Sequence, residues 1–175
     1  MNYEIEDRAR EQAAAQADNI TAMLERRDHA YSCRWEGDPG SCDAHLGAAT
    51  IGELDFFDPL RDYHEGESAQ EDIDQSPLSV EIRSGWTAPW AECEPYEFRI
   101  VLCTGGPAVQ IRGTIGVNGE PDTAWLEYQD WGTPWVQYTD DPGIHRDEVL
   151  SDTLREYSRC FIGGTKSPGW FGERR

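Results

Sequence analysis

The chain has 175 residues, of which 34 are acidic and 15 basic, so its formal net charge is −19. Such a polyanion repels phosphate backbones, because affinity for nucleic acid begins with Lys and Arg displacing counterions. Direct binding of nucleic acid through bulk charge is therefore excluded, whereas a basic protein surface is attracted and encountered faster. The simpler alternative is that the acidity only maintains solubility.

Aromatic residues and cysteines narrow the class of protein further. Seven Trp, seven Tyr and five Phe, mostly after Pro77, can supply a large buried area and argue against disorder. The first residues, MNYEIEDRAR, lack a basic and then apolar signal segment, and no run is long enough to span a membrane. Five cysteines cannot all pair within one chain, so we expect reduced thiols in a bacterial cytoplasm.

Residues 3 to about 28 have the periodicity of an amphipathic helix. The apolar stripe is narrow and mostly alanine, and consists of Ala9, Ala13, Ala17, Ile20 and Leu24. A stripe of this kind buries little area by itself, so the helix needs a surface to pack on. The small residues favour packing on the chain's own domain, with pairing to a second copy as the alternative.

The stretch from His29 to Gly47 has Gly-Asp-Pro-Gly at its centre and predicts a loop. It holds four side chains of the types that bind zinc, namely His29, Cys33, Cys42 and His45. A structural zinc ion bound by these four is one interpretation. The spacing lacks the paired Cys-x2-Cys of strong zinc motifs, and two free thiols beside two surface imidazoles are the simpler interpretation. A disulfide between Cys33 and Cys42 is the third.

The most acidic region of the chain comes next. From Glu53 to Asp74 there is a single basic residue, Arg61, and we expect the first half of the region to dock as a short helix and residues 65–75 to form a solvated connection. The nine acidic residues are Glu53, Asp55, Asp58, Asp62, Glu65, Glu67, Glu71, Asp72 and Asp74.

After Pro77 the sequence alternates in the manner of β-strands, which we expect at 78–83, 97–104, 108–115, 123–128 and 134–139. Gly105-Gly106 and Asn118-Gly119 are hairpin signals, the second because Asn-Gly can supply two residues of positive φ. Residues 145–161 predict a helix with an apolar face made of Val149, Leu150, Leu154, Tyr157 and Phe161.

The expected fold is α+β: an antiparallel meander of four to five strands, with an N-terminal helix and a C-terminal helix packing on the sheet. The expected organisation has three parts. An acidic helical arm and connector spans residues 1–76, the sheet domain with its C-terminal helix spans 77–162, and a flexible tail spans 163–175.

Catalytic patterns are weak throughout the chain. Cys103 precedes Thr-Gly-Gly, but a nucleophilic cysteine needs a base, and nothing in the sequence places His145 nearby. Glu81, Glu127 and Asp130 could pair for acid–base chemistry, yet the alternation of the strands favours solvated or hydrogen-bonded carboxylates. We therefore expect no catalytic residues and no enzymatic activity.

Five tryptophans flank turns and strand ends: Trp86, Trp90, Trp125, Trp131 and Trp135. Aromatic side chains in such places can anchor a protein interface. In a small sheet domain they more often form the core against the covering helix, and we expect core positions here. Trp86 and Trp90, in the loop GWTAPW, are expected to be the most exposed.

The run from Leu78 to Phe161, about half of the chain, resembles a group of small proteins carried by bacteriophages, prophages and plasmids. The matching segments are LSVEIRSGW at 78–86, LCTGGPAVQIRG at 102–113, AWLEYQDWGTPW at 124–135 and EYSRCF at 156–161. The resemblance implies a setting among accessory genes of mobile elements, many of which inhibit host defence, including CRISPR and restriction systems.

These observations predict a cytoplasmic accessory protein that binds and inhibits a basic, nucleic-acid-binding host protein. The acidic surface would either imitate nucleic acid or attract the partner, helped on the first helix by Glu4, Glu6, Asp7, Glu11, Asp18 and Glu25. Residues 1–76 carry 19 acidic and 6 basic side chains and the rest 15 and 9, which directs the prediction to the N-terminal half. The partner-binding set is the nine acidic residues with Trp86 and Trp90. The alternatives are a zinc-stabilised adaptor and a hydrolase without a recognisable motif.

Overall fold

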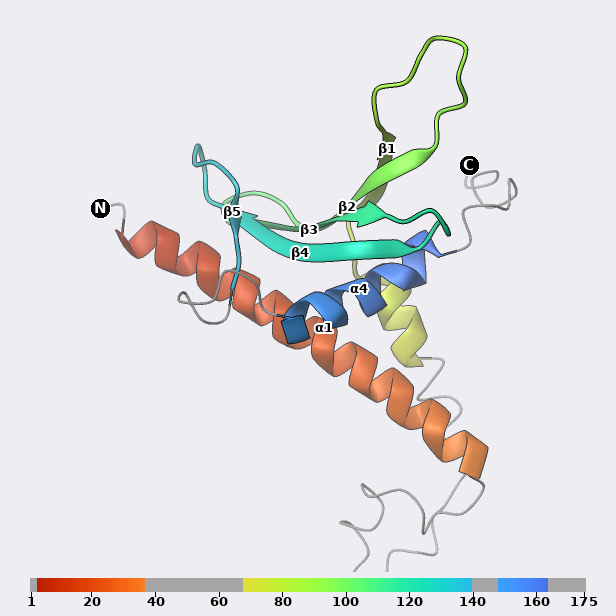
Figure 1. Ribbon diagram of the computed structural model, residues 1–175. Helices are drawn as coiled ribbons and strands as arrows, with labels where there is room; N and C mark the ends of the chain where they lie inside the picture. Colours follow the sequence, from red (N-terminus) through yellow and green to blue (C-terminus); the bar gives the residue numbers. More distant parts are fainter. Residues whose placement is uncertain (1–2, 37–67, 140–147, 164–175) are drawn as a thin grey trace, which may run out of the picture. The chain divides into compact units, whose positions relative to one another are not determined.

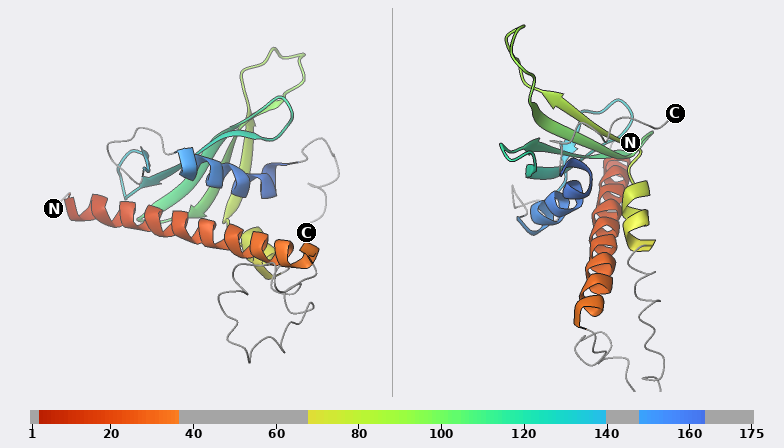
Figure 2. Two further views of the ribbon diagram at one scale, coloured as in Figure 1. Left: turned by 60° about the horizontal axis from the view of Figure 1, so that its bottom comes forward. Right: turned by 90° about the vertical axis from the view of Figure 1, so that its right-hand side faces the viewer.

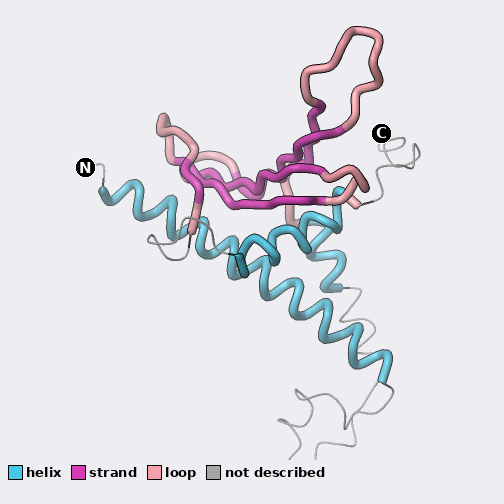
Figure 3. The backbone as a smooth tube through the Cα atoms, viewed as in Figure 1, coloured by secondary structure: helices cyan, strands magenta, loops and turns pink. Residues whose placement is uncertain are grey.

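The computed structural model describes residues 3–36, 68–139 and 148–163, which form a sheet and three helical segments (Figures 1 and 3). The chain divides into two compact units, one made of Met1–Ile20 with Ser76–Arg175 and the other of Thr21–Gln75. A helical stretch without further label covers residues 68–75. The other elements are α1 (Tyr3–Glu36), β1 (Ser79–Ser84), β2 (Pro95–Cys103), β3 (Ala108–Ile115), β4 (Pro121–Gln129), β5 (Val136–Gln137) and α4 (Glu148–Ile162).

The five strands form one antiparallel sheet in which spatial order equals chain order, β1-β2-β3-β4-β5. The predicted α+β meander with an N-terminal and a C-terminal helix is therefore confirmed. The expected fifth strand over 134–139 is reduced to the two residues of β5. None of the helices within the described ranges combines the length and the apolar character that crossing a membrane requires.

One face of the sheet supplies the core, because alternate residues of the central strands point to the same side. Ile100, Ile111 and Leu126 are register partners across β2, β3 and β4, and all three are fully buried. Helix α4 lies against this face (Figure 2) and is tied to β4 by a 3.0 Å hydrogen bond from Ser151 Oγ to the carbonyl of Ala124.

Helix α4 turns a stripe of residues toward the sheet, and these are Leu150, Leu154, Tyr157, Ser158 and Ile162. Glu148 in its first turn and Arg159 in its last complement the helix dipole. The predicted face was wrong at Val149, which is 78% exposed, because the stripe begins one residue later. The Tyr157 hydroxyl forms a hydrogen bond with Ser76 Oγ, which joins α4 to the segment that leads into β1.

The first part of α1 belongs to the sheet-containing unit, where the predicted alanine stripe Ala9, Ala13 and Ala17 is buried together with Ile20. Side chains this small let the helix backbone approach its neighbours closely. Arg10 fixes the helix next to β5, because its Nη2 donates to the carbonyl of Thr139 at 3.0 Å and its guanidinium lies 5.9 Å from the centre of the Tyr138 ring.

The second unit contains the rest of α1 and the helical residues 68–75. Met23 and Leu24 are buried on α1, and Ala69 and Ile73 are buried on the short helix. A 2.8 Å ion pair between Arg26 Nη2 and Asp72 Oδ2 joins the two helices. Two sequence interpretations were wrong here. Helix α1 continues through residues 29–36, where a loop was expected, and residues 68–75 are helical instead of a solvated connection.

The turn between β3 and β4 differs from the predicted two-residue Asn-Gly hairpin. Gly119 N–H donates to the carbonyl of Gly116 at 2.9 Å, and Gly116 N–H donates to the carbonyl of Glu120 at 2.8 Å. Gly119, with φ of 81°, is therefore the last residue of the turn and not its third. Asn118 accepts from Glu120 N–H through its side chain at 3.2 Å, as Asn commonly does in turns.

Candidate functional site

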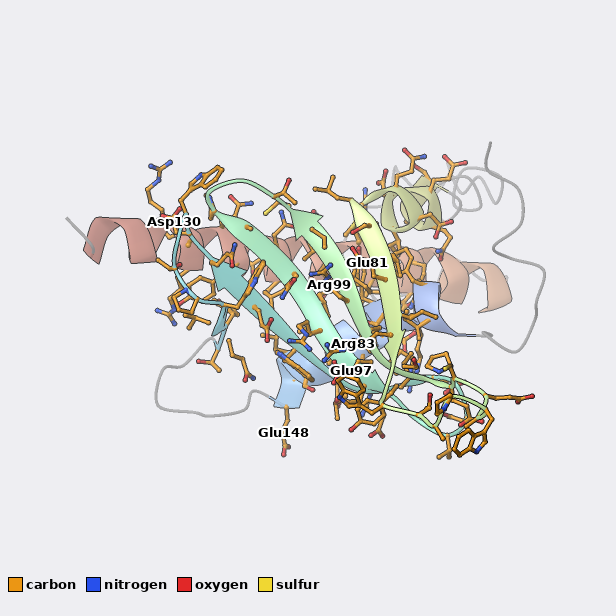
Figure 4. The ribbon with its side chains drawn as sticks, turned by 90° about the horizontal axis from the view of Figure 1, so that it is seen from above. Glu81, Arg83, Glu97, Arg99, Asp130 and Glu148 are labelled. Atoms are coloured by element: carbon orange, nitrogen blue, oxygen red, sulfur yellow. The ribbon has the colours of Figure 1, made fainter. Side chains whose placement is uncertain are left out.

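The sheet face opposite the core carries rows of charged side chains that run across the strands (Figure 4). In one row Glu81 on β1 is the register partner of Arg99 on β2, which is the partner of Arg112 on β3. Trp125 on β4 continues the row. In the next row Arg83 faces Glu97. We call this surface the charged face.

The arginines on this face are each paired with a carboxylate, and one carboxylate serves two of them. Arg99 donates to Glu81 at 2.5 Å, and Glu97 Oε2 accepts from both Arg83 at 2.5 Å and Arg112 at 3.0 Å. Glu97 therefore offsets the direct opposition of two arginines, Arg99 and Arg112. The hydrogen bond from Arg99 lowers the pKa of the Glu81 carboxyl below its usual value, and burial opposes this only in part.

Glu127, one of the predicted candidates for acid–base chemistry, is held by two donors. Gln110 Nε2 donates to one carboxylate oxygen and Trp125 Nε1 to the other, both at 2.7 Å. Gln110 is buried, and the carboxylate satisfies its side-chain amide. The hydrogen-bonded interpretation of Glu127 is thus confirmed.

A hollow of about 360 Å³ lies on the charged face. Carboxylates and guanidinium groups alternate along its wall, so it offers no uniform charge to a ligand. Its lining residues are Glu81, Ile82, Arg83, Glu97, Phe98, Arg99, Gln110, Arg112 and Trp135. Sequence analysis did not identify this surface, although the i, i+2 spacing of Glu81 with Arg83 and of Glu97 with Arg99 places each pair on one face.

The loop between β1 and β2, residues 85–94, forms a second candidate surface, which we call the aromatic loop. All ten of its residues are exposed, including Trp86 and Trp90, whose predicted exposure is confirmed. Pro89 and Trp90 are the central residues of a turn closed by a 2.9 Å hydrogen bond from Ala91 N–H to the carbonyl of Ala88. Pro at the first central position fixes φ for such a turn.

The other tryptophans correct the core prediction. Trp131 is 79% exposed and Trp135 is 38% exposed, while Trp125 is half-buried on the charged face. The core is filled by aliphatic residues together with Phe98, Tyr138 and Tyr157. Trp125 lies on the face that the helices do not cover, which the strand pattern does not reveal, and Trp131 and Trp135 lie in the connection between β4 and β5.

The acidic cluster is described only in part. Glu71, Asp72 and Asp74 are exposed on the short helix, where Asp72 pairs with Arg26 and Asp74 accepts from Gln70 at 2.9 Å. The six other members of the predicted set lie outside the described residues: Glu53, Asp55, Asp58, Asp62, Glu65 and Glu67.

Only two of the four predicted zinc ligands lie within the described residues. His29 is an exposed residue of α1, and Cys33 follows it by four positions in the same helix, while Cys42 and His45 lie outside the described residues. Within the described ranges no three His, Cys, Asp or Glu side chains gather around a common point that could hold a metal ion.

The described surroundings of Cys103 do not favour its thiolate form. Burial raises the pKa of its thiol, and its Sγ lies 3.9 Å from the carbonyl oxygen of Pro107. His145 lies outside the described residues. Asp130 uses a carboxylate oxygen to accept from Trp131 N–H at 2.7 Å, which fixes the turn after β4.

Comparison with protein-family models, with curated proteins and with solved structures gives no match for this chain.

Proposed function

We propose that the protein is a non-catalytic binding module that captures a basic segment of a partner protein. The observation that carries the proposal is the aromatic loop, where exposed Trp86 and Trp90 stand beside exposed Glu92 and Glu94. The loop contains no Lys or Arg. Large aromatic side chains left in water on a soluble surface are typical of interaction sites.

The chemistry of the loop selects for cations. An indole face attracts Arg or Lys within about 6 Å of its centre, and the attraction is worth about 0.5–1 kcal/mol at exposed sites. Neighbouring carboxylates add charge-assisted hydrogen bonds to the same groups. The turn at Ala88–Ala91 and the contact between Thr87 Oγ1 and Cys93 Sγ at 3.3 Å give the loop internal structure. Ordering before binding reduces the entropic cost of association.

The distribution of charge supports electrostatic steering of such a partner. Thr21–Gln75 contains 14 acidic and 4 basic residues, a net charge of 4 − 14 = −10, which is more than half of the total of −19. A field of this sign raises the rate of encounter with a basic surface.

Imitation of duplex DNA is the less favoured version of the proposal. Glu11 and Asp18 are exposed on α1 and are separated by seven residues, about 10.5 Å of helix rise, with no acidic residue between them. Duplex DNA presents one charge per about 1.7 Å of its axis. The proposal therefore assigns steering to the carboxylates and the specific contacts to the tryptophans.

The resemblance of residues 78–161 to proteins of bacteriophages and plasmids suggests the biological setting. In this setting the partner is a nucleic-acid-binding defence protein in the bacterial cytoplasm. Occupation of its basic surface by this chain would exclude the nucleic acid and inhibit the partner.

A peptide titration tests the proposal directly. The probe is an Arg- and Lys-rich peptide with a fluorescent label, with a control peptide of equal length in which every Arg and Lys is Gln, and the readout is the fluorescence anisotropy of the labelled peptide. We expect binding of the basic peptide alone, weakened at least tenfold between 50 and 200 mM salt, on the scale of charge-dominated association. The double variant W86A/W90A should abolish it, while W131A, which removes an exposed indole from another loop, should not. Equal binding by W86A/W90A, or binding indifferent to salt, overturns the proposal.

Identification of the natural partner uses the same variants. Proteins retained from bacterial lysate by the wild-type chain at low salt, and lost both at high salt and with W86A/W90A, are the candidates. Inhibition is then measured as the loss of nucleic-acid binding by the purified candidate when the chain is added. A candidate that keeps its full affinity for nucleic acid in the presence of the bound chain contradicts the inhibitory role.

A further inference from the structure

The outer edge of β1 is open in the described part of the chain. Strand β1 is the first strand of the sheet and pairs only with β2, so no described strand pairs with its other side. The last four residues of the strand, 81–84, are exposed, including the apolar Ile82 at 40%. An open strand edge is a template for another strand, and proteins usually block it.

We infer that β1 pairs with β1 of a second copy, so that two sheets join into one continuous sheet around a two-fold axis beside Ile82. In a closed dimer the same patch is used on both copies, and it must therefore be complementary to itself. Antiparallel pairing satisfies this condition, because a two-fold axis perpendicular to the sheet relates one strand to the other and keeps the charged faces on the same side.

Charge selects the position of the axis. Residues that face each other across strands share a face, so the axis must pass beside a residue and its own copy. An axis at Glu81 sets two carboxylates opposite each other, and an axis at Arg83 sets two guanidinium groups opposite each other. Like charges in direct opposition are destabilising.

The two remaining positions differ in how much of the strand they use. An axis at Val80 pairs residues 79–81 of β1 with their copies, whereas an axis at Ile82 pairs residues 80–84. The axis at Ile82 also sets Glu81 of each copy opposite Arg83 of the other, which gives two opposite-charge contacts. It buries Ile82 against its own copy on the face that belongs to the core.

The rows of charged side chains within each copy continue across the contact between the two β1 strands. Within one chain Glu81 already pairs with Arg99, and Arg83 with Glu97. The joined row reads Arg99, Glu81, then Arg83 and Glu97 of the second copy, so positive and negative groups alternate along it. Each carboxylate at the junction lies between two guanidinium groups, and ion pairs in a network of this kind contribute more than isolated surface pairs.

Sedimentation equilibrium across a concentration series tests the dimer. We expect the wild-type chain to reach twice the monomer mass with a concentration-dependent midpoint. E81R makes positions 81 and 83 both basic, and R83E makes them both acidic, so each variant should dimerise at least about tenfold more weakly. The control R159E reverses another exposed charge, on α4 and away from β1, and should dimerise as the wild type does. A wild-type chain that is monomeric at every concentration overturns the inference.

Mixing the two variants separates a lost interface from a damaged fold. Equal amounts of E81R and R83E set basic positions against acidic ones at both contacts, so a mixed dimer should form more tightly than either variant dimerises alone. One variant carries an affinity tag, and co-purification of the untagged one is the readout. Failure of the mixture to associate, while both variants keep the circular dichroism and urea midpoint of folded protein, contradicts pairing at this register.

Discussion

The ring of Phe98 on β2 covers Gly113, its register partner on β3. A Cβ at position 113 would lie 2.3 Å from Phe98 Cζ and 2.0 Å from the carbonyl oxygen of Thr123. The second clash is with backbone, which cannot move without breaking the pairing of β3 with β4. Gly113→Ala should therefore destabilise the fold by about 3 kcal/mol in urea unfolding. Gly85→Ala, where nothing lies within 4 Å, should change stability by less than about 0.5 kcal/mol. Equal losses of stability in the two variants would contradict the close packing of Phe98 and Thr123 around Gly113.

Packing of α4 on the sheet is tested by two aliphatic residues of the same helix. Leu154 is fully buried, and Leu154→Ala should cost about 2–5 kcal/mol of unfolding free energy. Val149 is 78% exposed, and Val149→Ala should be nearly neutral. Thermal or urea unfolding of both variants measures the difference. A large effect at Val149 would mean that the helix is rotated from the orientation described.

Tyr157 predicts how stability depends on alkaline pH. Burial raises the pKa of its hydroxyl from 10.0 to about 12, although the hydrogen bond with Ser76 lowers it in part. Because the folded pKa is above the unfolded one, this contribution to stability is complete below about pH 10 and is lost as the pH rises toward about 12. The free energy of unfolding of the wild type should therefore fall more steeply than that of Tyr157→Phe over this interval. Parallel curves would contradict the burial of the hydroxyl.

Glu97 forms two ion pairs on the charged face, one with Arg83 and one with Arg112. Glu97→Gln removes the charged partner of both Arg83 and Arg112, and it leaves Arg112 facing Arg99 while only Arg99 keeps a carboxylate partner, Glu81. We expect a loss of about 1 kcal/mol, discounted for the exposure of the arginines. Glu156→Gln, which breaks one exposed pair with Arg159 within α4, should cost less than about 0.5 kcal/mol. Chemical denaturation at low salt gives both values. A smaller loss of stability for Glu97→Gln than for Glu156→Gln would contradict the ion pairs of Glu97 on the charged face.

Much of the fold could be predicted because apolar and polar residues alternate cleanly along the strands and Gly- and Pro-containing connections separate them. The C-terminal end of α1 could not be predicted, because residues 29–36 include His, Tyr, Ser, Cys and Trp, which neither break a helix nor favour it strongly. The first strong breakers come at Gly37 and Pro39. The short helix at 68–75 was missed because only Ala69 and Ile73 mark its buried side.

Of the two candidate surfaces, the aromatic loop could be predicted from the sequence and the charged face could not. The exposure of Trp86 and Trp90 follows from a loop with Pro and Gly between two strands. The charged face depends on register, since a shift of β1 by one residue would turn Glu81 and Arg83 to the core side. Register is set by the turns and by pairing across strands, and no single strand sequence contains it.

The meander has a consequence for the order in which the chain folds. Every strand pairs with the next one along the chain, so each step of sheet formation closes a short loop at little entropic cost. Docking of the first twenty residues on the same unit closes a loop of more than fifty residues and comes at a higher entropic cost. The sheet with α4 should therefore form first, and the first twenty residues should dock on it last.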